Sequence, residues 1–368
     1  MVAAYTELPL AAQTAYAQLL DASLAAEHQR SVADISGSFA AKTVGGRKYW
    51  YFQYTEPAGK LRQIFVGPDT DAVRALVENK ARPSRRESLG PLARAAAALG
   101  CAEILPRHLR VIQRLAEYGF FAAGGVPVGT HAFLAFGNML GVRWGEASRT
   151  QDVDLAHAGK RLTIALPGNV EVRTDAAIES LAMGLLPTTG LSGKAGATWL
   201  DPREPEFRLD FLTPLHRGGE KRFEHSQLHV VLQPLKFLEY PLENVQQAVL
   251  FSGERTVVVN VPHPARYALH KLIVYGERES AFAPKSSKDL VQAYLLLACL
   301  KERRRWEVDE AWADLVSRGA GWRIRAMRGL KALDNAYPML GASDWLRARK
   351  LQAIPRSRTA PTKRRKTH

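Results

Sequence analysis

The sequence lacks most of the features that mark secreted, disulfide-stabilised or membrane-spanning proteins. Its 368 residues include only two cysteines, Cys101 and Cys299, too few for a disulfide scaffold or a structural zinc cluster. It has no run of about 18 uninterrupted apolar residues, so we expect no membrane-spanning helix. The first residues carry Glu7 and have no basic segment before a long apolar core, so we expect no secretory signal. These absences predict a cytoplasmic protein whose cysteines are reduced and buried.

Acidic residues are scarce relative to basic ones, and much of the imbalance lies at one end of the chain. There are 51 Lys and Arg against 36 Asp and Glu, which gives a net charge of +15. Residues 347–368 hold nine of these cations and no acidic residue, which leaves +6 for the other residues. We therefore expect a disordered basic tail attached to a mildly basic body. The tail sequence PTKRRKTH resembles a nuclear localisation patch, so a nuclear or host-delivered location is the alternative to a cytoplasmic one.

The order of predicted elements divides the chain into four parts. Residues 1–85 combine an Ala- and Leu-rich helix with a three-stranded antiparallel meander and end in a polar linker. Residues 86–262 mix helical and strand-like segments and form the predicted core. Residues 263–346 are helical throughout and predict a small helical bundle, followed by the tail at 347–368. The expected fold class is therefore α+β.

The predicted meander, at residues 38–68, combines aromatic and basic residues. Its aromatic residues lie among Arg47, Lys48, Lys60 and Arg62, and they are Tyr49, Trp50, Tyr51, Phe52 and Tyr54. One interpretation is a sheet face that stacks bases and holds phosphates. The other, which we prefer from sequence, is that the aromatic residues form the core of a small sheet, because they fit a pleated, half-buried surface.

Glycines are concentrated in residues 188–206, which we predict to be a polar excursion between elements. Part of this stretch, TTGLSGKAGAT, resembles a phosphate-binding P-loop. The G-x-x-x-x-G-K-[ST] pattern needs Gly at position 188 and Ser or Thr at position 195, where the chain has Thr188 and Ala195. We therefore exclude this stretch as a P-loop.

Three aspartates in strand-like segments are the strongest indication of chemistry. Asp152 and Asp154 are separated by one residue, so in a strand both point to the same face. Asp210 lies in the apolar centre of a second such segment, FRLDFLTPL. Asp is depleted from strands and costly to bury unpaired, so we interpret the three as ligands of a cation, with Mg²⁺ the best match to carboxylate oxygens. The alternative is a turn residue at Asp152 and a structural ion pair at Asp210.

Two further features would suit a phosphate-bearing ligand. Gly129 and Thr130 open a helix-like segment, and a helix N-terminus offers free N–H groups to an anion. Ordinary N-capping by Thr130 explains the same pattern. Downstream, a predicted helical region carries four cations that could grip a triphosphate, namely Lys271, Arg278, Lys285 and Lys288. Asp289 follows them and could orient one of the lysines. The alternative is a solvated basic face.

In this order, these features resemble the DNA polymerase β-like nucleotidyltransferase superfamily. Its pattern is a Gly-[Gly/Ser] turn into a helix, a strand with Asp-x-Asp, and a third Asp on a later strand; Gly129-Thr130, Asp152/Asp154 and Asp210 match it. The segment VPHPARYALHKLIVYGER…KSSKDLVQAYLLL is similar to the Lys…Lys-Asp signature of bacterial stand-alone members, including abortive-infection (AbiEii-type) and toxin nucleotidyltransferases. The resemblance spans residues 120–300. The chain departs from the pattern at Thr130, where Ser or Gly is usual, and in a longer gap before Asp152.

The resemblance implies a mixed sheet with flanking helices and an enzyme that transfers a nucleotide from an NTP, with release of pyrophosphate. It implies two Mg²⁺ ions held by Asp152, Asp154 and Asp210, with Asp210 helping to deprotonate the acceptor hydroxyl. Gly129, Thr130 and the cations listed above would bind the nucleotide, ATP among the candidates. The acceptor would be an RNA such as tRNA, a protein or a small molecule, and an antitoxin is a further expected partner. The alternative is a catalytically silent member of the fold that binds nucleic acid or regulates.

Overall fold

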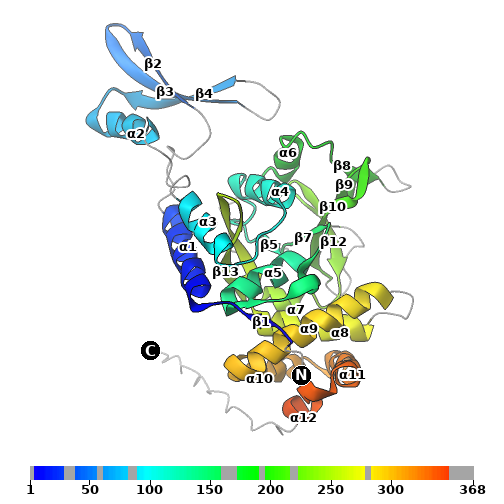
Figure 1. Cartoon of the computed structure of the whole chain (residues 1–368). Helices are drawn as coiled ribbons and strands as arrows, with labels where there is room; N and C mark the ends of the chain where they lie inside the picture. Colours follow the sequence, from blue (N-terminus) through cyan, green and yellow to red (C-terminus); the bar gives the residue numbers. More distant parts are fainter. Residues whose placement is uncertain are drawn as a thin grey trace, which may run out of the picture.

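The computed structural model describes residues 4–28, 38–55, 61–81, 89–158, 172–189, 195–215, 223–277 and 283–347. The predicted α+β class is confirmed, with helices and mixed sheets distributed along the chain (Figure 1). Cys101 and Cys299 are both free and buried, as expected. Among the helices in the described ranges, none has the length and apolar character needed to span a membrane. Of the predicted basic tail, Arg347 is the last residue of a helix, and residues 348–368 lie outside the described residues.

A central mixed sheet forms the middle of the body. Its path runs β11-β12-β10-β7-β5, and the β8–β9 pair joins it through β10. Strand β10 runs parallel to β7 and β12 but antiparallel to β9, so it joins the β8–β9 pair to the parallel strands. The strands are β5 (Val126–Pro127), β7 (Val153–Ala156), β8 (Leu186–Thr189), β9 (Ala195–Asp201), β10 (Glu204–Pro214), β11 (Phe223–His225) and β12 (Val230–Leu235).

The prediction of a polar excursion at 188–206 is wrong. Much of this stretch is β9, which pairs with β8 and β10 and buries Trp199 to 8 % exposure. Gly196 lies where two strands approach closely: a Cβ at this position would lie 2.8 Å from the Thr188 carbonyl oxygen. Glycine inside a strand often has this meaning, and it does not require a loop.

Helices and a β-hairpin cover the sheet and share one large apolar core with it. The hairpin turns after Ser252. Helix α5 ends at Gly141, which has φ of 69° and provides a left-handed C-terminal residue. These elements are α4 (Pro106–Glu117), α5 (Gly129–Leu140), α6 (Thr174–Glu179), α7 (Glu239–Leu242), β13 (Val245–Ser252) and β14 (Arg255–Pro262).

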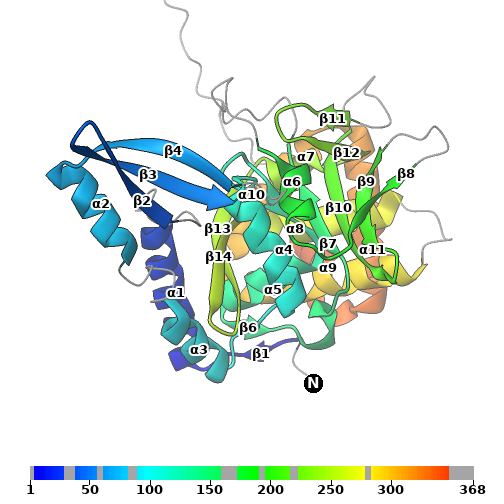
Figure 2. The same ribbon diagram turned by 90° about the horizontal axis from the view of Figure 1, so that it is seen from above.

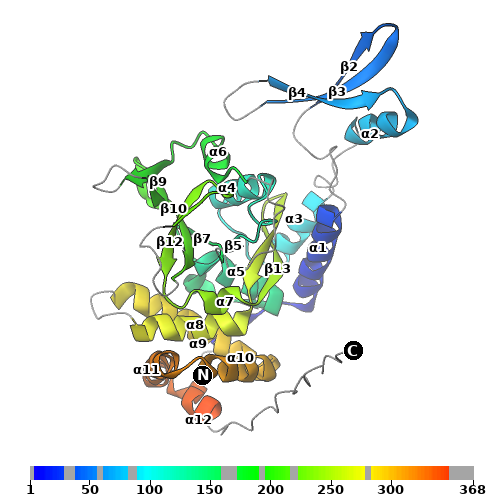
Figure 3. The same cartoon turned by 180° about the vertical axis from the view of Figure 1, so that it is seen from behind.

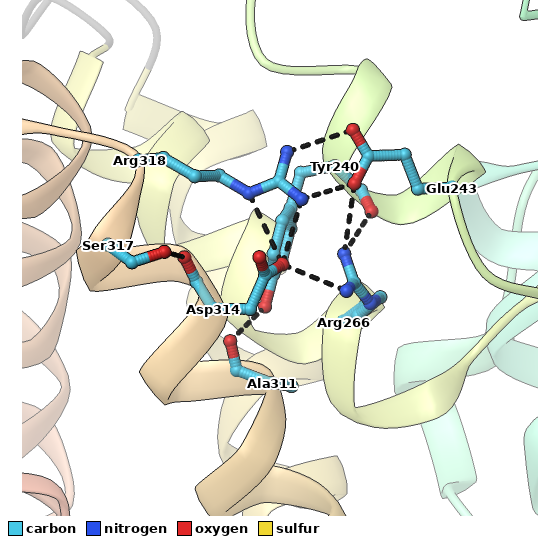
Figure 4. A network of polar contacts seen from close by, with 7 residues as sticks. All are labelled: Tyr240, Glu243, Arg266, Ala311, Asp314, Ser317 and Arg318. Atoms are coloured by element: carbon cyan, nitrogen blue, oxygen red, sulfur yellow. Dashed lines mark hydrogen bonds and ion pairs between the residues drawn. The ribbon is translucent and has the colours of Figure 1, made fainter. Parts of the chain in front are cut away.

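The C-terminal part is helical, as predicted, and its helices lie together on one side of the sheet (Figures 1 and 3). They are α8 (Pro264–Glu277), α9 (Ala283–Arg303), α10 (Arg305–Ser317), α11 (Ala320–Ala336) and α12 (Ala342–Arg347). Figure 4 shows how a polar network ties α10 to α7 and α8. Asp314 accepts from Arg266 and Arg318, both at 2.8 Å, and Glu243 pairs with the same two arginines. The network fixes the bundle against the core through two shared arginines.

The first helix packs against elements that are far away in sequence. Helix α1 (Leu10–His28) and α3 (Gly90–Ala98) lie against the β13–β14 hairpin (Figure 2). The Tyr16 hydroxyl donates to the Val249 carbonyl at 3.1 Å. The short strands β1 (Thr6–Glu7) and β6 (Val142–Arg143) pair beside them. This packing groups α1 with the body; the domain boundaries at 85, 262 and 346 stay predictions.

The predicted meander is present as β2 (Ser38–Val44), β3 (Arg47–Thr55) and β4 (Leu61–Pro68). All three strands are antiparallel in the order β2-β3-β4. Helix α2 (Asp71–Ala81) packs on one face, where Phe52 is 2 % exposed and Trp50 donates to Asp69 at 2.7 Å. Strands and helix together form what we call the meander module (38–81), which stands apart from the body in Figures 1 and 3.

Candidate active site

Three carboxylates converge on one face of the central sheet. Strands β7 and β10 are parallel neighbours, and their register places Asp154 directly opposite Asp210. Asp152 immediately precedes β7, so it lies two residues from Asp154 on the same side. One oxygen from each of the three side chains lies within 4.8 Å of the others. The structure thus brings together the three aspartates singled out from sequence.

The electrostatics of this cluster favour binding of a cation. Burial, together with the neighbouring charges of Asp152 and Asp210, raises the pKa of Asp154 to about 7. The pKa of Asp152 is instead lowered: partial burial opposes ionisation, but a hydrogen bond from Thr150 and the charge of Arg208 outweigh it. Three clustered carboxylates, one of them held back from ionising by burial and by its neighbours, offer the hard oxygen donors that a divalent cation prefers. The residues therefore fit a metal such as Mg²⁺.

Arg208 and Thr198 complete the cluster, and the sequence reasoning missed both. The Arg208 guanidinium lies 3.2 Å from Asp152 and 3.2 Å from Asp210, so it bridges two of the carboxylates. The Thr198 hydroxyl donates to Asp210 at 2.5 Å. Arg208 was detectable from the alternation Arg-Leu-Asp in β10, which puts it on the face of Asp210. Thr198 lies in the stretch that we predicted to be a polar excursion. Its contact with Asp210 depends on the pairing of β9 with β10.

Gly129 is the point at which helix α5 comes closest to the carboxylates. Its φ is 61°, and a Cβ there would lie 2.1 Å from Asp154 Oδ2. The backbone is also tied to the strand, because the Val128 N–H donates to the Asp154 carbonyl at 2.9 Å. The N-cap of α5 is Val128, without a side-chain hydrogen bond, so Thr130 is not the cap. The free N–H groups of the first turn therefore begin beside the carboxylate cluster.

Lys271 and Asp289 join α8 to α9 behind the cluster. Lys271 Nζ donates to Asp289 Oδ1 at 2.6 Å, and their side chains are only 15 % and 7 % exposed. Burial alone would lower the pKa of Lys271, but the charges of Asp289 and Asp154 raise it, so the lysine stays charged. The nearby Tyr267 hydroxyl donates to the Gly129 carbonyl at 2.7 Å and holds the start of α5. Lys271 therefore acts here as a buried counter-charge of the carboxylates.

A cleft of about 1030 Å³ opens next to Asp152. It is lined by the first turns of α4 and α5, the loop before β7 and residues of the hairpin and α9. Thr130 and Lys288 both line it, and Lys288 Nζ donates to the Arg149 carbonyl at 2.8 Å. Of the other predicted cations, Arg278 lies outside the described residues, and the structure does not describe the side chain of Lys285.

Two histidines in the wall of this cleft carried no signal that the sequence analysis used. His108 Nδ1 and His131 Nε2 lie 3.0 Å apart, with side chains 1 % and 2 % exposed. Burial lowers the pKa of His108 to about 4 and that of His131 to about 3. Both rings are therefore neutral at pH 7, and one donates to the other. The pair adds a polar, uncharged patch to the wall of the cleft.

Comparison with known proteins agrees with this geometry. A family model described as nucleotidyltransferase matches residues 107–317, more than half of the chain. No curated protein matched the chain, and neither did any solved structure. The matched range contains the Gly129 turn, all three carboxylates and the Lys271–Asp289 pair. The chain therefore belongs to the nucleotidyltransferase family.

Proposed function

We propose that the protein transfers a nucleotidyl group from an NTP to a hydroxyl group and releases pyrophosphate. The observation that carries this proposal is the convergence of Asp152, Asp154 and Asp210 beside the first turn of α5. Carboxylates that hold cations and backbone N–H groups that hold anions are the two parts that nucleotide phosphates require. Family membership supports the same chemistry at a coarser level.

Asp152, Asp154 and Asp210 are the residues that would hold the metal, with Mg²⁺ the expected ion and two ions the expected number. When bound, the metal supplies positive charge that offsets the charge of the phosphates and favours ionisation of the acceptor hydroxyl. Arg208 now neutralises part of the same cluster, through Asp152 and Asp210. Its guanidinium is thus placed to exchange these carboxylates for a phosphate oxygen when substrate binds.

The cleft is where we place the NTP. Its phosphates would lie against the first turn of α5, where the N–H groups after Gly129 and the Thr130 hydroxyl can donate. Lys288 lines the same cleft and supplies a cation. Lys271 is already bound to Asp289, so we assign it the role of a positioning residue that sets the charge around Asp154. The proposed role of Arg278 in nucleotide binding awaits a test by substitution.

In the proposed reaction, the acceptor oxygen forms a bond to the α-phosphorus of the NTP. The bond between the α-phosphorus and the bridging α–β oxygen breaks, and pyrophosphate leaves with that electron pair. The hydroxyl proton passes to a carboxylate, for which Asp210 is the proposed acceptor. An RNA such as tRNA, a protein and a small molecule are the candidate acceptors. A toxin-type role with an antitoxin partner, a cytoplasmic location and the use of ATP are further proposals.

The test is transfer of label from each α-³²P NTP in the presence of Mg²⁺, with total RNA, cell protein and small-molecule extract as acceptors. We expect label to appear in one acceptor class and to be lost in Asp152→Ala, Asp154→Ala and Asp210→Ala. A loss of about 100-fold or more is expected, because each carboxylate contributes to the charge that stabilises the transition state. Chelation of divalent ions should abolish transfer in the wild type.

Glu206→Gln is the matched control, since Glu206 is an exposed carboxylate on the same strand as Asp210. It should retain full transfer. Equal label transfer by wild type and Asp152→Ala would refute the proposed site. Nucleotide and nucleic-acid binding without transfer from any NTP would instead support the silent, binding role.

A further inference from the structure

The exposed side of the meander module carries a set of aromatic and basic side chains that the proposed catalytic site does not use. We define this open face as Lys42, Arg47, Tyr49, Tyr51 and Phe65. The strand register places Lys42 opposite Tyr49 and Phe65 opposite Tyr51, so these side chains share one face. Arg47 lies on the same face, because it is two residues from Tyr49 along β3.

The opposite face of the sheet is the one that packs against α2. There Phe52 is buried, Phe39 contacts it with ring centroids 5.2 Å apart, and a Cβ at Gly67 would lie 3.5 Å from Val73 of α2. The small sheet therefore has its apolar core on that side. The sequence-based preference, that the aromatic residues form the core, holds for Phe52 but leaves Tyr49, Tyr51 and Phe65 without that explanation.

The aromatic rings of the open face form a partly exposed platform of rings inclined to one another, with Phe65 at 45° to Tyr49 and at 66° to Tyr51. Phe65 is 56 % exposed, and its ring contacts those of Tyr49 and Tyr51 with centroids 6.1 and 5.5 Å apart. Lys42 Nζ lies 4.8 Å above the Tyr51 ring, so a cation is fixed beside the platform. Three adjacent rings at a sheet surface expose π-faces onto which planar groups can stack.

The charge of the same strands is of one sign. Residues 38–55 and 61–68, as described by the structure, contain no Asp or Glu, while Lys42, Arg47 and Lys48 are basic. A partner that combines planar rings with regularly spaced negative charge complements this surface. Single-stranded nucleic acid has both properties, whereas a base-paired duplex hides its ring faces in the stack.

We propose that the open face binds single-stranded nucleic acid by stacking bases on Tyr49, Tyr51 and Phe65, with Lys42 and Arg47 holding the phosphates. Binding at this face does not require catalysis. The further step, in which the module delivers a nucleic-acid hydroxyl to the carboxylate cluster, rests on the proposed function and makes nucleic acid its acceptor class.

The test is fluorescence anisotropy of the full chain with a labelled oligouridine of about 12 nucleotides, without NTP or metal. The double variant Tyr51→Leu/Phe65→Leu keeps apolar bulk but removes two π-faces, and we expect it to bind roughly tenfold more weakly or worse. Tyr51→Phe keeps the ring and should bind as the wild type does. Trp306→Leu is the matched control, because Trp306 is an aromatic residue 66 % exposed on α10.

Charge variants separate this face from the rest of the basic surface. Lys42→Gln/Arg47→Gln should weaken binding and reduce the slope of affinity against salt, whereas Arg328→Gln/Lys331→Gln on α11 should leave both unchanged. A fourfold substitution in the tail, of Lys363, Arg364, Arg365 and Lys366 by Gln, measures the contribution of that segment. Circular dichroism of each variant checks that the strands remain folded.

The proposal is overturned if the wild type does not bind, if the double Leu variant binds as tightly as the wild type, or if only the tail substitution reduces binding. Tighter binding to a duplex of the same length would also overturn it, because stacking requires unpaired bases. The binding assay contains neither NTP nor metal, so it measures this face and not the transfer reaction. Failure of this binding and failure of nucleotide transfer are therefore distinguishable results.

Discussion

Gly129 shows how closely the backbone of α5 approaches the carboxylate cluster. Its left-handed φ of 61° already favours glycine, and the space that a side chain would need is filled by Asp154. Gly145 has nearly the same φ, 63°, but nothing lies within 4 Å of its Cβ position. The two residues therefore separate the effect of backbone conformation from the effect of the clash.

We predict that Gly129→Ala lowers the free energy of unfolding by more than Gly145→Ala does. Both substitutions carry a backbone cost of about 1–2 kcal/mol, and Gly129→Ala adds an overpacking cost of about 1–3 kcal/mol. Displacement of Asp154 should also reduce transfer about 100-fold. Denaturant unfolding and label transfer measure the two effects; equal behaviour of the two variants would contradict the close approach.

Asp154 makes stability depend on pH and metal. Its pKa is raised from 3.8 to about 7, so between these values the folded protein binds more protons than the unfolded chain. Asp154 therefore destabilises the metal-free fold most above pH 7, and this destabilisation disappears as the pH falls below 4.

In chelator, the wild type should lose free energy of unfolding between pH 5 and pH 8 because Asp154 ionises. We predict that Asp154→Asn loses less over the same interval, by on the order of 1 kcal/mol or more. Addition of Mg²⁺ should stabilise the wild type at pH 8 and have little effect on Asp154→Asn. Denaturant titrations at the two pH values test this, with Glu206→Gln as the control. A parallel pH dependence of wild type and Asp154→Asn would contradict the raised pKa.

Among the elements, helices α8 and α11 pack backbone against backbone. A Cβ at Gly329 of α11 would lie 2.1 Å from the Leu272 carbonyl oxygen, and one at Gly276 of α8 would lie 2.2 Å from the Arg325 carbonyl oxygen. Each helix thus presents a glycine to the backbone of the other. Both glycines lie in segments that the sequence predicts to be helical, but their positions at the contact depend on the packing of the two helices.

Gly329→Ala should destabilise the protein, although Ala is favoured over Gly in a helix by about 1 kcal/mol. The clash with the α8 backbone forces the two helices apart, at an expected cost of about 1–3 kcal/mol. Gly321→Ala on the same helix is the control, because the nearest atom to its Cβ position is the end of the Arg325 side chain, at 3.4 Å. Thermal unfolding compares them; a stabilised Gly329→Ala would show that the helices are not in close contact.

The strands and helices of the site differ in how far the sequence reveals them. The alternation of Asp152 and Asp154 and the apolar setting of Asp210 predict their common face, because strand periodicity is a local property. Strands β9 and β10 form a hairpin with a two-residue turn, but β9 is missed because the glycines of residues 193–196 resemble a loop when read alone. Thr198 and the His108–His131 pair are recognisable as part of the site only once the strands and helices are assembled.

At the scale of the whole molecule, the meander module has a core of its own. Phe52 is buried among module residues, and it lies outside the three buried apolar clusters that hold the body together. The sequence predicts the meander because its strands follow one another with short turns. It does not predict that α1, which precedes the meander, packs on the body instead.

Phe52→Ala should therefore unfold the module without unfolding the body. Loss of a buried aromatic ring costs about 3–5 kcal/mol, which is large for a unit of this size. We expect calorimetry to show loss of one transition while the transition that responds to Mg²⁺ keeps its midpoint. Phe251→Ala, a buried aromatic substitution in the body, is the matched comparison and should shift the Mg²⁺-responsive transition. A single transition lowered equally by both substitutions would contradict two independent cores.

The contact between Tyr16 and Val249 has a consequence for how the chain is made. The two residues are separated by 233 positions, so a growing polypeptide exposes the apolar side of α1 long before its partner strand leaves the ribosome. At ordinary rates of translation this interval lasts on the order of 10–50 s. The meander, whose contacts are local, can fold within that time, while α1 must wait. The side of nascent α1 that contacts the hairpin is thus exposed during most of synthesis.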